Sequence, residues 1–318
     1  MWIALSLVGL LVFIYWYTYP RLGEVVLSGW EQQAMQRANL VRRRYDINGI
    51  SVSVLETEGR RDRNKPLLMM IHGFTGDNTV WLALAAQFKD DYHVVVPDLP
   101  GHGQTGFSPD WQYSISAQAK LLNALIWRMG YQRATLIGNS MGGYIAAYMA
   151  RYQSNAIEAC ILLAPAGLPA NQKSQLDDML DRGQNPFFVT RRRAWYRLVD
   201  MSMASGPYVP KMVKDVLADR HIKRVNQYQR VFTDFIAAGY FDPDELVKIQ
   251  VPVLTIWGGR DELLDPSALD NWVNTLHCDW EMFHDVGHMP MLEAPGRTYQ
   301  RIVNFIQVKN LARQDQAA

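Results

Sequence analysis

The hexapeptide Gly138-Asn139-Ser140-Met141-Gly142-Gly143 constrains the fold of this chain more than any other feature. It contains the pattern G-x-S-x-G, follows the apolar run 134–137 and leads into a helix-like segment over 144–151. In that setting the pattern is typical of a nucleophile elbow, a turn so sharp that small residues must flank the serine. Such a turn exposes the serine hydroxyl at a helix N-terminus, beside backbone N–H groups that can face a developing oxyanion. The alternative is a plain glycine turn with an incidental serine, so the rest of the sequence must supply a base and an acid.

Short apolar runs alternate with amphipathic stretches on both sides of this motif. An Asn48-Gly49 hairpin is followed by expected strands over 67–71, 93–96, 134–137, 157–163, 251–257 and 280–283. Amphipathic patterns predict helices between them, over 78–88, 115–129, 144–151, 267–276 and 297–308. Continuous apolar runs are typical of strands buried on both faces. We therefore expect a mainly parallel sheet covered by helices on both faces.

The regular alternation of strand-like and helix-like segments stops after Ala166 and resumes near residue 246. Residues 167–245 contain helical segments separated by prolines and are rich in methionine and aromatic side chains. Methionine adapts to varied apolar shapes, so the segment suits a helical cap, or lid, over an acyl chain. The same residues could instead pack the small core of the insertion itself. We name five of them, together with one residue that follows the last strand, as candidate substrate-binding residues: Phe187, Phe188, Trp195, Met203, Tyr208 and Met289.

The N-terminus differs from the rest of the chain. Residues 2–19 carry no charge, and as a helix they would span about 27 Å, close to the thickness of a bilayer core. We expect residues 1–20 to form a single-pass membrane anchor and 21–44 a juxtamembrane helix or linker. This second segment could lie on the membrane or pack on the catalytic domain. All nearby arginines follow the span, which favours a cytoplasmic catalytic domain.

Length and composition exclude several other classes of protein. The 318 residues suffice for one large α/β domain with an insertion, divided here into a core over 45–166 and 246–310, the cap, and a frayed tail over 311–318. A net charge of +1 gives no broad basic face for nucleic acid. Cys160 and Cys278 are isolated, so they form neither a disulfide framework nor a thiolate metal site. We expect no metal and no nucleic-acid partner, and the sequence leaves the oligomeric state undecided.

The chain supplies a base and an acid in a definite order after Ser140. His288 lies just beyond the last expected strand, and Asp261 follows the strand that ends at Trp257. The order Ser140, Asp261, His288 places each residue at the carboxyl end of a strand, where open α/β sheets carry their sites. His284 is a weaker candidate for the base. Asp265 and Asp285 are weaker candidates for the acid, because one precedes a helix-initiating proline and the other suits a turn.

The loop after the 67–71 strand reads His72-Gly73-Phe74-Thr75-Gly76. We expect the oxyanion to be held by the backbone N–H of Phe74 from this loop and by that of Met141, directly after the serine. His72 and Gly73 are expected to orient the loop.

These motifs together resemble the α/β-hydrolase superfamily. The resemblance rests on residues 72–74, 98–103, 138–143, 257–261 and 287–288, and it extends over roughly residues 45–310. It implies an eight-stranded α/β-hydrolase sheet with a helical cap inserted after the sixth strand. The N-terminal span, Ala164-Pro165-Ala166-Gly167-Leu168 and the segment 257–265 further resemble membrane-anchored monoacylglycerol lipases and related bacterial lipases.

That family implies hydrolysis of carboxylic esters of glycerol by a serine, a histidine and an aspartate, without a cofactor. The implied partners are an apolar ester or acylglycerol substrate and the lipid bilayer. Two alternatives stay open. The elbow is also similar to that of carbon–carbon bond hydrolases acting on aromatic ring-fission products, and a catalytically silent scaffold of the same fold would carry the same motifs.

Overall fold

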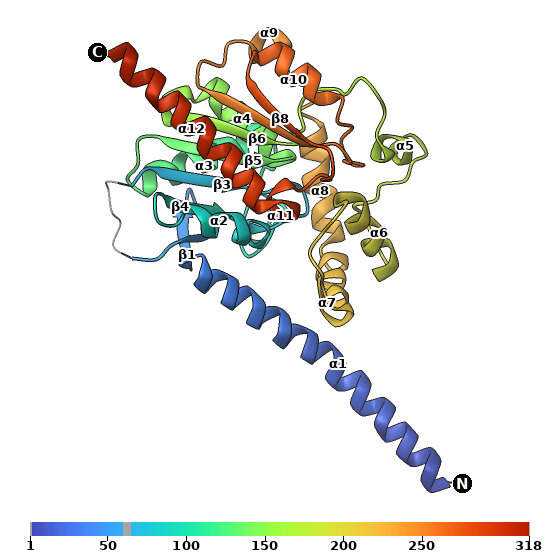
Figure 1. The fold of residues 1–318 in the computed structure, drawn as a ribbon. Helices are drawn as coiled ribbons and strands as arrows, with labels where there is room; N and C mark the ends of the chain where they lie inside the picture. Colours follow the sequence, from blue (N-terminus) through green and yellow to red (C-terminus); the bar gives the residue numbers. More distant parts are fainter. Residues whose placement is uncertain (1, 60–64, 318) are drawn as a thin grey trace.

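A computed structural model describes the backbone of residues 2–59 and 65–317, and the side chains of residues 18–59 and 65–309. Figure 1 shows a twisted sheet between two layers of helices, with one long helix extending away from it toward the N-terminus. The strands are β1 (Leu40–Ile47), β2 (Ile50–Thr57), β3 (Leu67–Ile71), β4 (His93–Pro97), β5 (Ala134–Asn139), β6 (Ile157–Leu163), β7 (Val253–Gly258) and β8 (Asp279–Phe283). Their order in the sheet is β1-β2-β4-β3-β5-β6-β7-β8.

All strands from β3 onward pair in parallel, whereas β1 and β2 form an antiparallel hairpin whose second strand pairs antiparallel with β4. The hairpin turns at Asn48 and Gly49, which both have positive φ, as the Asn-Gly pattern predicts. The expected α/β-hydrolase sheet of eight mainly parallel strands is confirmed.

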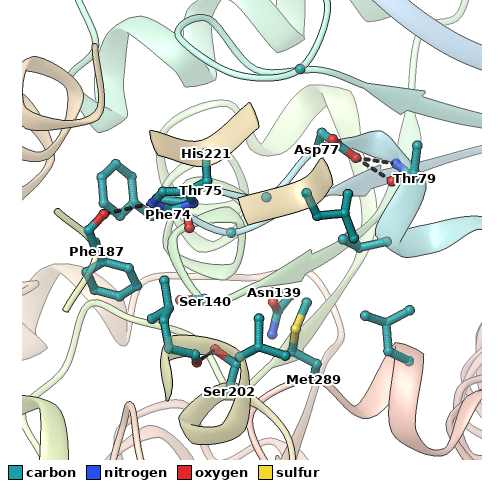
Figure 2. Close-up of a pocket in the computed structure, with 18 of the residues that line it drawn as sticks. Phe74, Thr75, Asp77, Thr79, Asn139, Ser140, Phe187, Ser202, His221 and Met289 are labelled. Carbon is teal, nitrogen blue, oxygen red and sulfur yellow. Dashed lines mark hydrogen bonds between the residues drawn. The ribbon is translucent and has the colours of Figure 1, made fainter. Parts of the chain in front are cut away.

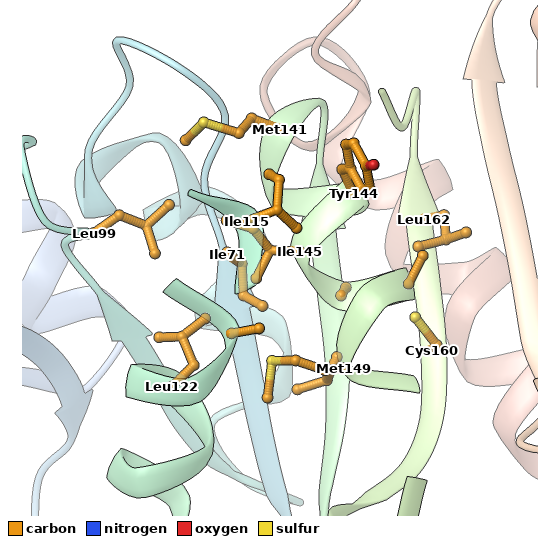
Figure 3. Packing of buried hydrophobic residues seen from close by; sticks show 14 of the residues in the cluster. Ile71, Leu99, Ile115, Leu122, Met141, Tyr144, Ile145, Met149, Cys160 and Leu162 are labelled. Carbon is orange, nitrogen blue, oxygen red and sulfur yellow. The ribbon is translucent and has the colours of Figure 1, made fainter. Parts of the chain in front are cut away.

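Side chains alternate between the two faces of the sheet along the strands, so each face has its own core cluster, and Figure 3 shows part of one of them. In β3, Leu67, Met69 and Ile71 join one core cluster, while Leu68 and Met70 join the other. The first face is covered by α3 (Ile115–Arg128), α4 (Met141–Tyr152) and α10 (Ala268–Leu276). The second is covered by η1 (Asn78–Trp81), α2 (Leu82–Phe88), α11 (Pro290–Glu293) and α12 (Pro295–Ala317).

Five helices lie between β6 and β7 in the sequence. They are α5 (Gln175–Asp181), α6 (Arg192–Ser202), α7 (Lys211–Ile222), α8 (Val225–Ile236) and α9 (Pro243–Leu246). A second short 3₁₀ helix, η2 (Ser154–Ala156), precedes β6. No strand occurs between Leu163 and Val253, as the sequence pattern predicts.

Three boundaries differ from those expected. Helix α1 (Trp2–Arg37) continues through Pro20, where its end was expected, because the chain beside the proline is held on α7, for example by the Tyr19 hydroxyl, which donates to Asp215 at 3.2 Å. The sheet begins at Leu40, so residues 40–44 belong to it rather than to a juxtamembrane linker; Arg43, for example, pairs with Val54 of β2. At the other end, α12 extends to Ala317 where a frayed tail was expected from residue 311; the side chains of that tail lie outside the described part.

The expected membrane span over residues 2–19 is not supported by the structure. Within the described residues, no helix combines the length and low polarity needed to cross a bilayer. The side chains of residues 2–17, on which the prediction depends, are outside that part of the chain. The described part of α1 packs on α7: a side chain at Gly23 would meet the main-chain oxygen of Met212 at 2.6 Å. This agrees with the alternative that the segment after Pro20 packs on the catalytic domain.

Candidate active site

Ser140 lies at the turn between β5 and α4, with φ 56° and ψ −120°. This conformation is unfavourable for a residue with a side chain, at a cost on the order of 1–3 kcal/mol. The surrounding backbone holds it: the Ser140 N–H donates to Leu163 O at 3.0 Å, and its carbonyl accepts from the N–H groups of Tyr144 and Ala166, each at 3.0 Å. The expected sharp turn at Ser140 is therefore present.

The turn needs glycines because other backbone segments pass very close to it. A Cβ on Gly142 would lie 2.2 Å from Ile71 O, and one on Gly138 would lie 2.2 Å from Gly142 O. No L side chain fits at such distances without moving the main chain. The glycines therefore allow the elbow to pack directly against the end of β3.

His288 and Asp261 lie together at the carboxyl ends of β8 and β7. The Nδ1 of His288 is 2.7 Å from Asp261 Oδ2, and both residues are buried. The second oxygen, Oδ1, accepts from the main-chain N–H groups of Leu263 and Leu264, each at 2.9 Å. The indole Nε1–H of Trp257 donates to Oδ2 at 3.1 Å. Since the carboxylate accepts from four donors, it is fixed in place, and His288 Nδ1 carries the proton that points to it.

Ser140 and His288 line the same cavity, which has a volume of about 880 Å³. Figure 2 shows Ser140 at this cavity. The structure thus brings together the serine and the histidine at one cavity, and the histidine and the aspartate by a hydrogen bond. His284 is exposed at the end of β8, and Asp265 accepts from Ser267 N–H at the start of α10, so neither competes for these positions.

The loop after β3 approaches the serine closely. A Cβ on Gly73 would lie 3.0 Å from Ser140 Cβ, and Phe74 follows it. Met141 is the first residue of α4, where an N–H has no partner within the helix. Its side chain is buried in the core on the α4 face of the sheet (Figure 3), so a role at the site would fall to its main-chain N–H.

His72 holds this loop through both ring nitrogens. Nδ1 is 2.8 Å from Gly73 O, and Nε2 accepts from Leu99 N–H at 3.0 Å. This pattern requires the neutral Nδ1–H tautomer. Burial lowers the pKa of His72, which keeps the ring neutral. The expected orienting position of His72 agrees with this geometry.

Phe74 joins the loop to the insertion. Its ring contacts Phe187 at a centroid distance of 5.2 Å, Phe232 at 5.4 Å and Tyr228 at 5.8 Å. Phe187 is in turn held by its carbonyl, which accepts from His221 Nε2 of α7 at 2.8 Å (Figure 2). Burial lowers the pKa of His221, so the imidazole that donates is neutral.

The six candidate substrate-binding residues divide into two groups. Phe187, Trp195, Met203 and Met289 line the cavity. Phe188 and Tyr208 are not among the lining residues: Phe188 packs edge-on against Phe232, and Tyr208 is 86% exposed in the loop before α7, so contact of these two with substrate stays a prediction. Their aromatic character alone gave no indication of which side of the insertion they would occupy.

The cavity has an apolar part and a polar part. Apolar side chains from the insertion and from the segment after β7 line the first: Leu176, Phe187, Leu198, Phe232, Phe235, Leu263 and Leu264. The polar part is lined by Ser28 and Glu31 of α1, by Arg42 of β1, and by the α7–α8 residues Lys214, Arg220, Lys223 and Arg224. Helix α1, part of which was expected to be a juxtamembrane segment, therefore forms part of the wall of this cavity.

Some of these charges are neutralised within the described part of the chain. Arg220 pairs with Glu24 and, at 3.6 Å, with Glu31. Arg42 lies 3.4 Å from Asp98, whose pKa is raised by burial. None of Lys214, Lys223 and Arg224 forms an ion pair with a described carboxylate. Arg224 forms a side-chain hydrogen bond with Tyr228, and Asp77, Asp98 and Asp200 also line the cavity, so its polar residues carry charges of both signs. The arginines of β1 contact protein groups in this structure, since Arg43 also pairs with Glu56 at 2.6 Å.

Asn139 is a functional position that the sequence analysis missed. Its Nδ2 donates to the main-chain oxygen of His288 and to that of Leu163, each at 3.0 Å. The amide next to the serine thus fixes the loop that carries the histidine. No local pattern indicates this contact, because the two residues are 149 positions apart. Among the described residues, no cluster of histidine, cysteine, aspartate and glutamate could hold a metal ion.

Comparison with known proteins agrees with the geometry. The family described as the α/β hydrolase fold matches residues 66–295. Human monoacylglycerol lipase ABHD6 is 27% identical over 258 residues, 77% of each chain, and Lipase 3 of a Moraxella species is 29% identical over 231 residues, 71% of this chain and 73% of that one. The crystal structure of a membrane phospholipase A, described as a bacterial virulence factor, is 30% identical with a TM-score of 0.86 and covers 96% of this chain and 97% of its own.

The expected resemblance to monoacylglycerol lipases and bacterial lipases is confirmed by these similarities. The family match covers well over half of the chain and includes the elbow, the aspartate and the histidine. This chain belongs to the α/β-hydrolase fold family.

Proposed function

We propose that this protein is a serine carboxylic ester hydrolase that acts on apolar acyl esters of glycerol, with monoacylglycerols as the first candidate. The observation that carries the proposal is the shared cavity of Ser140 and His288, with His288 Nδ1 held 2.7 Å from Asp261 Oδ2. The lipases among the similar proteins support the same reaction class.

The mechanism follows from the roles of these groups. His288 Nε2 takes the proton of the Ser140 hydroxyl as the oxygen attacks the ester carbonyl, and Asp261 stabilises the imidazolium that forms. The N–H groups of Phe74 and Met141 hold the negative charge that develops on the carbonyl oxygen. His288 then gives its proton to the departing alcohol, leaving an acyl-enzyme. A water molecule, deprotonated by His288, releases the fatty acid and restores Ser140.

The two parts of the cavity suit the two halves of such a substrate. The aromatic and leucine side chains beside Phe74 can bury an acyl chain, at about 0.8 kcal/mol for each methylene removed from water. The polar part can accept the glycerol portion. The insertion supplies most of the apolar wall, which supports its role as a cap over residues 167–245.

Esters of graded acyl length and monoacylglycerols test the proposal directly. We expect turnover of these esters, and a loss in kcat on the order of 10⁴–10⁶-fold in Ser140→Ala. Ordinary turnover by that variant would refute the mechanism. A protein that is folded but neither hydrolyses esters nor reacts with a fluorophosphonate would be a silent scaffold. Cleavage of ring-fission diketones in preference to esters would identify a carbon–carbon bond hydrolase.

A glycerophospholipid is a second candidate substrate, favoured by one observation. Lys214, Lys223 and Arg224 line the polar part without a described carboxylate partner, and a phosphate group would supply the missing anion. The similar phospholipase A supports this candidate. The double change Lys223→Gln and Arg224→Gln should then reduce kcat/KM for a lysophospholipid while leaving that for a monoacylglycerol within about twofold. Equal effects on both substrates would argue against a phosphate subsite.

Membrane attachment through residues 2–19, with the catalytic domain on the cytoplasmic side, remains a proposal that rests on the sequence. It is compatible with the place of Ser28 and Glu31 in the cavity wall, because α1 would then join the bilayer to the site. Protease accessibility of the catalytic domain in sealed vesicles of known orientation tests both the attachment and the side.

A further inference from the structure

The loop that carries His288 is held by a carboxylate outside the serine–histidine–aspartate set. Glu293, the last residue of α11, accepts from Gly287 N–H with both oxygens, each at 3.0 Å. Its Oε1 also accepts from Met289 N–H at 3.2 Å. The carboxylate therefore binds the main chain on both sides of the catalytic histidine. Hydrogen bonds of this kind, with an ionised acceptor, are roughly twice as strong as those between neutral groups.

The same carboxylate also reaches the insertion. Glu293 Oε2 accepts from Ser205 N–H at 2.9 Å, in the segment that follows α6. A second bond lies beside it, from His288 N–H to Ser202 O at 3.1 Å. The two segments are in close contact, since a Cβ on Gly287 would lie 2.7 Å from Ala204 N. The histidine loop and residues 202–205 thus form one hydrogen-bonded unit.

This unit also borders the cavity. Ser202 and Met203 line it from the insertion, and His288 and Met289 line it from the core. A change in the position of the insertion would move acceptors and donors that hold the histidine. A small displacement of a catalytic group, of about 1 Å, is enough to cost roughly 10²-fold in rate.

We propose that Glu293 is a positioning residue that couples the insertion to His288, so that the base is held in its working position only while residues 202–205 are docked on its loop. The inference rests on the proposed ester hydrolase function and adds a requirement for that reaction. Glu293 touches neither the reacting atoms nor the substrate in this arrangement. It acts through the main chain of Gly287, Met289 and Ser205.

Replacement of the carboxylate tests the position of the histidine. Glu293→Gln keeps the shape of the side chain but turns an N–H donor toward groups that need an acceptor. We expect kcat to fall about 10²-fold for both p-nitrophenyl acetate and p-nitrophenyl decanoate, with KM within about twofold of the parent. Glu281→Gln is the matched control: Glu281 of β8 pairs with Arg301 of α12 at 3.3 Å and does not line the cavity, so this variant should keep the parent kcat.

Substitutions at Ser205 test the contact between Glu293 and the insertion without changing the loop that carries His288. Ser205→Pro removes the N–H that reaches Glu293, whereas Ser205→Ala retains it. We expect Ser205→Pro to lower kcat for the decanoate, whose chain contacts the insertion, by about tenfold more than for the acetate. Ser205→Ala should match the parent for both esters.

The outcomes distinguish this inference from a purely structural role and from failure of the proposed function. A folded Glu293→Gln protein with parent kcat and only a lower melting temperature would overturn it. If that variant does not fold, equal kinetics in Ser205→Pro and Ser205→Ala overturn it instead. A parent protein without ester turnover that depends on Ser140 would refute the proposed function, whatever the Glu293 variant does.

Discussion

At the scale of single residues, the hydrogen bonds of Asp261 explain why this position needs a carboxylate. Its two oxygens have separate partners, with His288 and the Trp257 indole on Oδ2 and two main-chain N–H groups on Oδ1. The main-chain donors require an acceptor on one side, and the imidazole N–H requires one on the other. Only an ionised carboxylate satisfies both sides at once.

We expect Asp261→Asn to reduce kcat for an ester by about 10⁴-fold. The amide has only one oxygen. If this oxygen accepts from the Leu263 and Leu264 N–H groups, the amide NH₂ group faces His288 Nδ1, which must then be the acceptor, so that the proton moves to Nε2 and His288 can no longer take the serine proton. Steady-state kinetics with a p-nitrophenyl ester measure the effect. Asp285→Asn is the control, because Asp285 is exposed and pairs with Arg297; a similar loss there would show that the effect is not specific.

The pH dependence of stability is a second prediction at the scale of residues. Burial lowers the pKa of His72, His102 and His221 below the ordinary value of 6.5. Below about pH 6.5 the unfolded chain therefore binds protons that these folded imidazoles do not. The free energy of unfolding should fall as the pH decreases from there, by up to about 1.4 kcal/mol per pH unit for each histidine.

Melting temperatures between pH 8 and pH 5 measure this slope in the parent and in two variants. His102→Gln should reduce the slope, because His102 is 1% exposed and its Nε2 has no partner among the described residues. His221→Gln should also reduce the slope, because burial lowers the pKa of His221 as well. Identical slopes in all three proteins would contradict the assignment.

At the scale of elements, the site depends on how closely the β5–α4 turn approaches β3. The glycines of the elbow are in contact with main-chain atoms rather than with flexible side chains, so nothing nearby can move aside. The same contact carries the β3 loop, with His72, Gly73 and Phe74, to the serine. Packing of two main-chain segments therefore sets the distance between Ser140 and the loop that carries Phe74, the proposed nucleophile and one of the proposed oxyanion donors.

Gly142→Ala should lower the free energy of unfolding by about 1–3 kcal/mol and reduce kcat, because its Cβ would lie 2.2 Å from Ile71 O. Urea denaturation and ester kinetics measure the two effects. Gly296→Ala provides the comparison, since a Cβ there meets nothing within 4 Å. Comparable destabilisation in both variants would show that close packing is not the cause.

At the scale of the molecule, α1, the insertion and the core share one cavity. α1 contacts α7 along the segment after Pro20. Asp215 of α7 joins the two helices by accepting from the Tyr19 hydroxyl of α1 at 3.2 Å. Asp215 also accepts from Lys211 of its own helix at 2.8 Å. The Lys211 bond and the nearby Arg192 hold the pKa of Asp215 below its ordinary value, although burial alone would raise it. The wall of the polar part of the cavity thus depends on how α1 is seated.

Gly23→Leu should displace α1 from α7 and raise KM for a monoacylglycerol several-fold, with a smaller effect on p-nitrophenyl acetate. The reason is that its Cβ would meet Met212 O at 2.6 Å and Val216 at 2.9 Å, while Ser28 and Glu31 of the same helix line the cavity. Gly29→Leu lies on the same helix with nothing within 4 Å and should match the parent in both assays. An unchanged KM in Gly23→Leu would show that the position of α1 does not affect substrate binding.

Much of the fold could be predicted because its signals are local. The Asn48-Gly49 turn, the apolar runs of β3 to β7 and the proline-interrupted insertion each lie within a few consecutive residues. The expected helix boundary at Pro20 was wrong because local sequence and tertiary packing act in opposite directions there. The proline alone favours a helix end, whereas contacts with α7 continue the helix. The sequence names both Phe187 and Phe188 as candidate substrate-binding residues, because both are apolar and only packing decides that Phe187 lines the cavity.

Motif and chain order alone single out Ser140, Asp261 and His288, because the elbow chemistry needs small residues around the serine and the strand ends place the other two beside it. The tertiary structure alone decided which groups hold these residues in place. Asn139 and Glu293 bind the histidine loop, and α1 lines the cavity, through contacts between segments far apart in the sequence. Such contacts arise from the packing of the whole chain, and a local pattern of residue types carries no record of them.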